Sequence, residues 1–510
     1  MEKKIIIKNS VFGFYYQIIQ LSFSFIVRPL LIKYIGTDLL GLNGTVASLI
    51  AAFSLTDAGF STAILFRLYK PFNEDDSEEI GKLIDVYKRI YRVIAICVLI
   101  IAILVSFFLP LLLKKIIITP QIYVYYFLQV ASTVSTYLLA YRRCLFQADQ
   151  KEYLLKIIDS VFFIITQIGE IIAVVIFRSY GLYLIIALIG AFLPNFVIEK
   201  YSKKKYELPQ CDKIDKELLS KVVGDSKYLF VGAISAFVFN NTDSIIISSF
   251  IATSLVTVVG NYMIVKNGIC TIGSSIISPT LASIGRMNSN KNVNKDTKFQ
   301  YFKLHSHSCY LICSIILVPT SVVINDFIKL WVGSSFLLKE TIVLLVILQI
   351  YLWIVPISCG DFLTTNGLFK QSRTADFLAM VLNLGFSIVL LNVLGLIGIF
   401  IGTVIGQFVA WIYRSAVIMK EVFFDESLLK YWIKHILYFV VFLINAHLVN
   451  ILFNRVYINE GWIGFLIGGL IIFGSNIIII NIELMLLSKE HRYIWRIIKN
   501  YIKKSMKGDV

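Results

Sequence analysis

Charged residues are scarce in this chain, and that scarcity argues against a soluble protein. Only 16 % of the 510 residues are Asp, Glu, Lys or Arg, whereas about a quarter is usual for a soluble domain. Hydrophobic residues make up 57 % of the chain, and the mean hydropathy is +0.78. The composition therefore predicts a membrane protein.

Signals of catalysis and of metal binding are also missing. The five histidines stand apart from any carboxylate constellation, and the seven cysteines show no metal-ligand spacing. Neither a Walker A loop nor a dinucleotide-binding glycine turn occurs. We therefore expect no catalytic residue, no metal site and no cofactor, and the chain is not expected to be an enzyme.

Long apolar segments fill the sequence instead. A membrane helix needs about 20 mostly apolar residues, and helices satisfy their own backbone hydrogen bonds in lipid. We predict an all-α polytopic membrane protein with about 14 transmembrane helices, at 11–34, 41–66, 91–113, 121–141, 157–177, 181–199, 224–250, 256–284, 304–325, 339–365, 375–393, 395–417, 432–453 and 461–484.

The distribution of basic residues predicts the orientation of these helices. Most of the 48 lysines and arginines lie at the two ends of the chain and in alternate loops. Because basic loops stay in the cytoplasm, both termini are expected there. The net charge of +16 then reflects topology and contact with anionic lipids, and no nucleic-acid partner is expected. The opposite side holds only Lys33, Lys114, Lys115, Arg178, Lys329, Lys339 and Arg455.

The chain repeats itself once. The segment "IGTDLLGLN" from Ile35 corresponds to "IATSLVTVVGNY" from Ile251, and "YGLYLIIALIGAF" from Tyr180 corresponds to "LGLIGIFIGTVIGQF" from Leu394. Each unit holds six spans, so the halves share one orientation and are related by a pseudo-twofold axis along the membrane normal. We predict a first lobe at 1–199, a cytoplasmic linker at 200–222, a second lobe at 223–420, and two extra helices with a basic cytoplasmic tail at 421–510.

A few charged residues lie within the predicted spans. An ionised group at the bilayer centre costs at least about 2.5–3.5 kcal/mol, so each needs a partner or a cavity. Arg28 and Lys266 are candidates for binding a diphosphate, because cationic side chains suit phosphate oxygens. Asp57, Glu170 and Asp243 are candidates for charge balance or for coupling to H⁺ or Na⁺. Polar neighbours expected to line the same cavity are Gln17, Gln20, Ser24 and Asn240.

Structural roles for these charges stay open beside the functional ones. Arg28 pairing with Asp57 would fasten the first two spans together, and Lys266 pairing with Asp243 would do the same in the second half. Arg28 also lies in the outer half of its span, from which its side chain can reach the interface. Asp361 lies near an inner span end and is expected to be solvated.

The sequence resembles the polysaccharide (O-antigen, Wzx-type) flippases of the multidrug/oligosaccharidyl-lipid/polysaccharide exporter superfamily. The resemblance rests on "VRPLLIKYIGTDLLGLNGTVASLIAAFSLTDAGFSTAILFRLY" from Val27, with its Asp-x-Gly stretch at Asp57, and on "FNNTDSIIISSFIATSLVTVVGNYMIV" from Phe239. It implies movement of an undecaprenyl-diphosphate-linked oligosaccharide, such as an O-antigen or capsule unit, to the outer leaflet of a bacterial cytoplasmic membrane. Other polysaccharide-assembly membrane proteins are implied partners.

The lipid II flippase branch of that superfamily refines the expectation. Its cationic cavity is lined from spans 1, 2 and 8, where Arg28 and Lys266 occupy matching positions, whereas Asp57 departs from the pattern. The same branch implies a cation site at Asp243, Asn383 and Thr403. Two other functions stay open: a cation-coupled multidrug exporter of this superfamily, and a membrane polysaccharide polymerase, against which the short outer loops argue.

Overall fold

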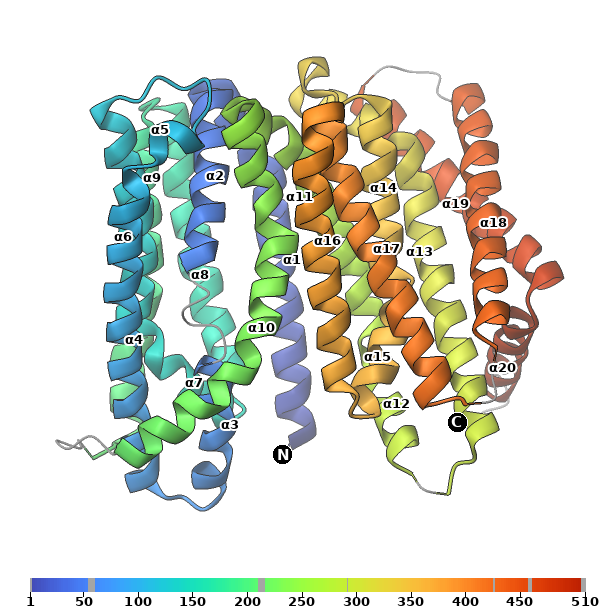
Figure 1. The fold of residues 1–510 in the computed structure, drawn as a ribbon, viewed down its shortest axis with the longest axis horizontal. Coiled ribbons are helices and arrows are strands. Elements are labelled where there is room, and N and C mark those ends of the chain that lie inside the picture. The colour runs from blue at the N-terminus through green and yellow to red at the C-terminus, as the bar shows by residue number, and fades with distance from the viewer. Residues whose placement is uncertain are drawn as a thin grey trace. The chain divides into compact units, whose positions relative to one another are not determined.

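Every regular element that the structure describes is a helix. The computed structural model describes residues 2–53, 60–209, 216–290, 292–424, 427–456 and 461–505. The chain divides into two compact units, Met1–Gly260 and Asn261–Val510, coloured from blue to green and from green to red in Figure 1. The sequence repeat instead assigns residues 223–260 to the second lobe. That assignment stays a prediction.

Twelve of the described helical segments are long and apolar enough to cross a membrane, which makes the chain an all-α polytopic membrane protein. They lie on α1 (Glu2–Ile35), α4 (Ser77–Ser106), α8 (Glu152–Val175), α9 (Tyr180–Lys205), α10 (Lys216–Ile246) with the short η3 (Ile247–Ile251), α11 (Thr253–Ile277), α13 (Lys295–Val332), α14 (Glu340–Ile354) continued by α15 (Ile357–Thr365), α16 (Phe369–Leu394), α17 (Leu396–Glu421), α18 (Leu428–Val456) and α19 (Trp462–Leu487).

The two remaining predicted spans also fall on helices. Segment 41–66 corresponds to α2 (Thr37–Phe53) and α3 (Phe60–Asn73), and residues 54–59 lie outside the described ranges. Segment 121–141 corresponds to α6 (Pro120–Leu139), whose Tyr, Ser and Thr residues dilute its apolar character. A total of fourteen spans therefore stays a prediction. The shorter elements are α5 (Leu109–Leu112), η2 (Ala140–Arg142), α7 (Arg143–Ala148), α12 (Pro279–Ser289), η4 (Ser334–Phe336) and α20 (Lys489–Ser505).

Several helices continue well beyond their apolar spans. α4 begins at Ser77, because Asp76 Oδ1 accepts hydrogen bonds from the backbone N–H groups of Glu78 and Glu79 at 3.1 and 3.0 Å. The predicted linker at 200–222 is partly helical too, since α9 ends at Lys205 and α10 begins at Lys216. Hydropathy locates the apolar part of a helix, whereas caps determine where the helix begins.

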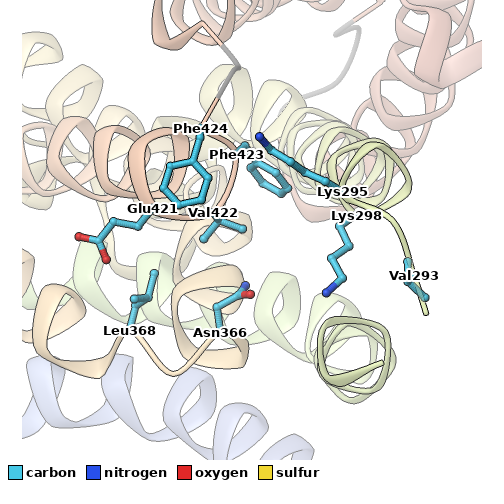
Figure 2. A pocket seen from close by; sticks show the side chains of 9 residues that line it. All are labelled: Val293, Lys295, Lys298, Asn366, Leu368, Glu421, Val422, Phe423 and Phe424. Carbon is cyan, nitrogen blue, oxygen red and sulfur yellow. The ribbon is translucent and has the colours of Figure 1, made fainter. Parts of the chain in front are cut away.

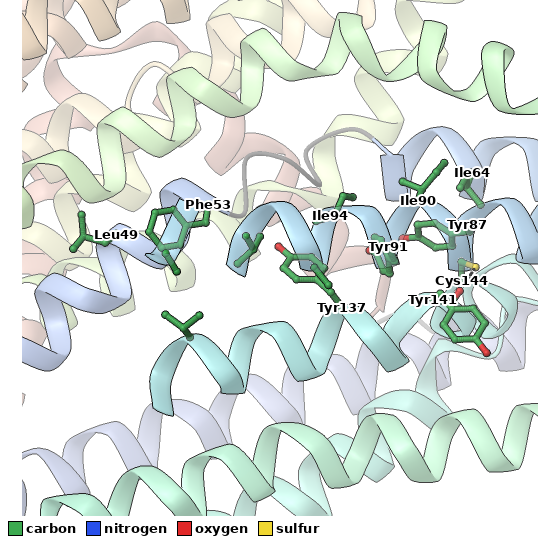
Figure 3. Close-up of a cluster of buried hydrophobic side chains, with 14 of the residues drawn as sticks. Leu49, Phe53, Ile64, Tyr87, Ile90, Tyr91, Ile94, Tyr137, Tyr141 and Cys144 are labelled. Carbon is green, nitrogen blue, oxygen red and sulfur yellow. Dashed lines mark hydrogen bonds between the residues drawn. The ribbon is translucent and has the colours of Figure 1, made fainter. Parts of the chain in front are cut away.

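The core of unit 1 lies between α2, α3, α4 and α6. Leu49, Phe53, Ile64 and the rings of Tyr87 and Tyr91 belong to one buried cluster (Figure 3). The Tyr87 hydroxyl donates to the Tyr91 hydroxyl at 2.5 Å, so the buried phenols satisfy one another. This cluster holds the four helices as one body.

Packing against α8 positions α1. Asn9 bonds the start of α8 through both ends of its amide: Nδ2 donates to Gln150 O at 2.8 Å, and Oδ1 accepts from Tyr153 N at 2.9 Å. Further along α1, the rings of Tyr16 and Phe23 both meet Phe163 edge-on, at 6.1 and 5.9 Å between centroids. One face of α1 is thereby fixed up to the level of Arg28.

A close backbone contact positions the start of α11 within unit 1. A Cβ atom on Gly41 of α2 would lie 2.1 Å from the backbone oxygen of Thr253, so only glycine permits this approach. Nearby, Thr257 Oγ1 donates to the backbone oxygen of Thr37 at 2.7 Å. The first turns of α11 are therefore held against the beginning of α2.

In unit 2, α16 and α17 pack along a stripe of small residues. Gly398, Gly402 and Gly406 recur at every fourth position of α17, the spacing that lets membrane helices approach closely. Cβ atoms on Gly402 and Gly406 would lie 2.3 Å from Ser387 Oγ and 2.5 Å from Ala379 O. Helix association in lipid depends on such contacts, because burying apolar surface gains little there.

The extra C-terminal helices join unit 2 through α13. Asn476 of α19 donates through Nδ2 to Ser314 O at 3.2 Å. His307 of α13 pairs with His491 of α20 at 3.2 Å and with the Tyr438 hydroxyl of α18 at 2.7 Å. Burial lowers the pKa of His491, which favours its neutral form. His307, His491 and Tyr438 thus form a buried polar contact among three helices.

The glycine stripe gives a direct stability prediction. Gly402→Ala should destabilise unit 2 by about 1–3 kcal/mol, because the new methyl group overlaps Ser387 and forces the helices apart. The measurement is thermal unfolding of the purified protein in one detergent. Gly385→Ala on the facing helix is the matched control, since a Cβ there meets nothing within 4 Å. Equal melting temperatures for the two variants would contradict this packing account.

Candidate functional site

Arg28 is held inside unit 1 by the backbone of α11. The side chain is half-buried, and its Nη2 donates to the backbone oxygen of Thr257 at 2.8 Å. A Cβ atom on Gly260 would lie 2.7 Å from Nη2, so the guanidinium occupies space that a glycine leaves open. A carbonyl carries no formal charge. This contact therefore fixes the side chain without cancelling its positive charge.

Glu170 of α8 lies in the same region of unit 1. Its side chain is only 5 % exposed, and its Oε2 accepts a hydrogen bond from Gln167 Nε2 at 2.7 Å. The hydroxyl of Tyr183 on α9 lies close enough to both Glu170 and Arg28 for their charges to act on it. Arg28, Glu170 and Tyr183 therefore belong to the part of unit 1 where α1, α8 and α9 pack together.

Tyr183 is the residue that the sequence prediction missed. It packs against the cluster of Val27 and Leu31 on α1 and Val174 on α8, and it also touches the core of unit 1. One weak signal was present, the repeated segment that begins at Tyr180. A tyrosine in an apolar span is most often a core residue, so its place where α1 and α8 meet becomes apparent only in three dimensions.

The structure does not describe one partner of the proposed pair of Arg28 and Asp57. Asp57 lies within 54–59, outside the described ranges, so the ion-pair alternative stays open. Asp243 lies on α10 and is half-buried in unit 1. Its roles in charge balance and coupling also stay predictions.

Lys266 is held within unit 2 by a neutral partner. Its Nζ donates to Gln349 Oε1 of α14 at 2.6 Å. Gln349 is 1 % exposed, and its Nε2 donates to the backbone oxygen of Phe400 at 3.4 Å. An amide provides an acceptor without a charge, so this contact, like that of Arg28, leaves the cation intact.

Two residues of the predicted cation site meet in unit 2. Asn383 Oδ1 accepts hydrogen bonds from Thr403 Oγ1 at 3.2 Å and from Ser387 Oγ at 3.1 Å. The bond from Thr403 joins α17 to α16 beside the glycine stripe and strengthens the helix contact, whereas the bond from Ser387 lies within α16. Asp243 belongs to unit 1, so the three-residue cation site stays a prediction.

The predicted polar lining is largely accessible. Gln17, Ser24 and Asn240 are exposed, and Gln20 is half-buried. Ser24 Oγ donates to Gln20 O, and Asn240 Nδ2 donates to Ala236 O, both at 2.8 Å. Their exposure is compatible with a lining role, which stays a prediction.

Asp361 differs from its expected solvated state. Its Oδ2 lies 2.9 Å from Nε2 of His305, which is itself buried on α13. Thr280 Oγ1 lies 3.5 Å from the other ring nitrogen of His305. The prediction was wrong because the partner lies 56 residues away in the chain, which local sequence context cannot show.

A separate cavity of about 390 Å³ opens at the ends of α13, α15 and α17 in unit 2 (Figure 2). Lys295, Lys298 and Glu421 lie around it beside the rings of Phe423 and Phe424. Lys298 Nζ donates to Asn288 O at 2.9 Å, and the Lys295 ammonium lies over the Phe424 ring. No group of three His, Cys, Asp or Glu side chains among the described residues is placed to hold a metal ion.

Solved transporter structures share this fold. A lipid II flippase, MurJ, in an inward closed conformation superposes with a TM-score of 0.73 at 15 % identity, covering 94 % of this chain and 99 % of that one. An inward-facing multidrug resistance MATE family transporter of the MOP superfamily gives 0.59 at 13 % identity, covering 78 % and 92 %. A mutant of the Vibrio cholerae MATE transporter VcmN gives 0.54 at 14 % identity, covering 83 % and 98 %.

A family model places the sequence as well. No curated protein matches the chain. The model of the family described as "Polysaccharide biosynthesis protein" matches residues 6–287, more than half of the chain. This match places the chain among proteins of polysaccharide biosynthesis, and its fold is one that solved transporters share. The chain belongs to the polysaccharide biosynthesis protein family and has the fold of the multidrug/oligosaccharidyl-lipid/polysaccharide exporter superfamily.

Proposed function

We propose that this protein is a flippase for undecaprenyl-diphosphate-linked oligosaccharides, the repeat units of an O-antigen, a capsule or a similar polymer. The proposal rests on Arg28, whose guanidinium lies within an apolar span and donates a hydrogen bond to the backbone oxygen of Thr257. Family membership supports the polysaccharide part, and likeness to a lipid II flippase supports the lipid-linked part. The substrate would move from the inner to the outer leaflet of a bacterial cytoplasmic membrane, with both termini in the cytoplasm.

The chemistry of a diphosphate explains why a cation is retained at this position. An arginine inside a membrane protein costs at least about 2.5–3.5 kcal/mol on insertion scales. The planar guanidinium offers a rigid set of donors that matches phosphate oxygens, and the interaction strengthens away from water. Arg28 in unit 1 and Lys266 in unit 2 would bind the diphosphate at different stages of an alternating-access cycle.

Glu170 is the best candidate for coupling transport to an ion. It is nearly fully buried, its hydrogen-bond donor Gln167 is neutral, and it shares Tyr183 with Arg28. A carboxyl group in such surroundings can exchange a proton when the bound anion arrives or leaves. Asp57 and Asp243 would contribute to the charge balance, and Na⁺ at Asp243, Asn383 and Thr403 is the competing coupling site.

The charge of Arg28 also separates this proposal from a multidrug exporter. Cation-coupled exporters of this superfamily carry organic cations, which the guanidinium of Arg28 repels. An anionic lipid-linked substrate gains from the same charge. Other polysaccharide-assembly proteins in the membrane would be its partners, supplying the finished repeat unit on one side and consuming it on the other.

Removal of the guanidinium should abolish transport. In a strain that lacks this gene, Arg28→Ala should fail to restore surface polysaccharide although the protein is present in the membrane at normal level. Arg28→Lys should restore display in part, because an ammonium keeps the charge but loses the planar fork. Display is measured by surface labelling of the polysaccharide, and protein level by immunoblot.

The structural alternative is tested by a second mutation in the same strain. If Arg28 only neutralises Asp57, the Arg28→Ala/Asp57→Ala pair should recover display. Loss of display in the pair as well supports substrate recognition. Normal display in the deletion strain itself would contradict the flippase assignment.

Substitution of Glu170 tests proton coupling. In vesicles containing the purified protein, an imposed pH gradient should accelerate transport by the wild type, whereas Glu170→Gln should transport at one rate with or without the gradient. Glu152→Gln is the matched control, because Glu152 begins the same helix and pairs with Lys156 at 3.4 Å on a more exposed surface. A Glu170→Gln protein that still responds to the gradient would rule out this residue as the proton site.

A further inference from the structure

The helix α20, dark red in Figure 1, has a basic side and an apolar side. Its basic residues recur at every third or fourth position, the spacing that puts side chains on one side of a helix. They are Lys489, Arg492, Arg496 and Lys499. The isoleucines on the opposite side are Ile494, Ile497 and Ile498. This pattern is typical of helices that lie in the interface between a membrane and water.

The first two turns of α20 are fastened to unit 2. Glu490 pairs with Lys434 of α18 at 2.8 Å, and His491 makes the contact with α13 described above. Trp495 Nε1 donates to Asn481 Oδ1 of α19 at 3.1 Å. The beginning of α20 is therefore part of unit 2 and has a defined orientation there.

The junction between α19 and α20 places the helix next to the membrane surface. The backbone is extended at Ser488, with φ −117° and ψ 122°, so the chain turns there. Arg492 Nη1 donates to the backbone oxygens of Met485 and Leu486 at 3.3 and 3.5 Å, which satisfies carbonyls that the end of α19 leaves free. Because α19 is a candidate membrane span that ends at Leu487, α20 begins where that span leaves the lipid.

Both sides of α20 are accessible beyond its first turns. Ile497 and Ile498 are 51 % and 40 % exposed. Arg496 and Lys499 are exposed as well. Exposed apolar side chains beside basic ones match a lipid surface, because the apolar groups enter the acyl boundary while the long basic side chains reach the phosphates.

The charge of α20 favours anionic lipids over zwitterionic ones. Residues 489–500 carry four basic side chains and a single acidic one, Glu490. The ion pair with Lys434 neutralises that carboxylate. Each Lys or Arg close to an anionic membrane surface strengthens binding by about 5-fold. Four such residues on one side of a short helix therefore give a marked preference for anionic headgroups.

We propose that α20 binds anionic phospholipids of the cytoplasmic leaflet and lies along the surface of that leaflet. Its isoleucines contact acyl chains, and its arginines and lysines contact lipid phosphates. The inference does not depend on the proposed substrate, since the lipids that bind α20 are not transported. Through His491 and Glu490, α20 would connect the lipid surface to α13 and α18.

Hydrogen–deuterium exchange of the full-length protein in nanodiscs tests this inference. One set of nanodiscs contains phosphatidylcholine alone, and the other contains phosphatidylcholine and phosphatidylglycerol in equal parts. The backbone amides of α20 should exchange at least about 10-fold more slowly in the anionic nanodiscs, because bound lipid opposes local opening of the helix. Arg496→Gln/Lys499→Gln should lose most of that protection, since two of the charges that bind lipid phosphates are gone.

The matched control is Lys203→Gln/Lys204→Gln, which removes two charges from exposed lysines at the end of α9. It should leave the exchange of α20 as in the wild type. Equal exchange of wild-type α20 in the two kinds of nanodisc would contradict the inference, and so would a double variant of α20 that keeps its full protection. Protection that occurs only in nanodiscs with two copies of the protein would overturn it in favour of contact with a second copy.

Discussion

The hydrogen bond from Arg28 to the backbone of Thr257 is the constraint on which the rest of this account depends. It requires a helix, α11, to approach close enough for a long polar side chain to end on its backbone. Gly260 provides the space for the guanidinium, and Gly41 allows the α2–α11 contact that fixes the carbonyl. The anchor is neutral, so the structure holds a positive charge in place without cancelling it through this bond.

Small residues also allow close helix approach in unit 2. The stripe of Gly398, Gly402 and Gly406 lets α17 lie against α16. Two hydrogen bonds then cross the contact, from Thr403 Oγ1 to Asn383 Oδ1 and from Ser387 Oγ to the backbone oxygen of Ile399. In lipid, backbone proximity and buried hydrogen bonds replace the hydrophobic effect as the source of helix association. These glycines therefore lie where two helices, or a helix and a charged side chain, approach each other closely.

Hydropathy was sufficient to predict the class of fold, an all-α polytopic membrane protein. Each of the fourteen predicted segments falls mainly on described helix, because a run of about 20 apolar residues has few alternatives. Short turns, as at 107–108, 278 and 355–356, interrupt some of the segments. Arg28, Glu170 and Lys266 were also recognisable in advance, since a charge in an apolar run stands out. What the sequence could not supply were the partners. Nothing in the local sequence distinguishes Tyr183, Gln349 or the His305–Asp361 pair. Their contacts arise because helices from distant segments pack together.

Direct observation of lipid translocation by the isolated protein tests the central claim most directly. The purified protein is reconstituted into vesicles with a fluorescent undecaprenyl-diphosphate-linked disaccharide in both leaflets, and a membrane-impermeant quencher is added outside. The account predicts nearly complete quenching in vesicles that contain the protein, and quenching of only the outer leaflet in empty vesicles. Protection of the inner leaflet in both kinds of vesicle, together with export of a cationic dye, would contradict it.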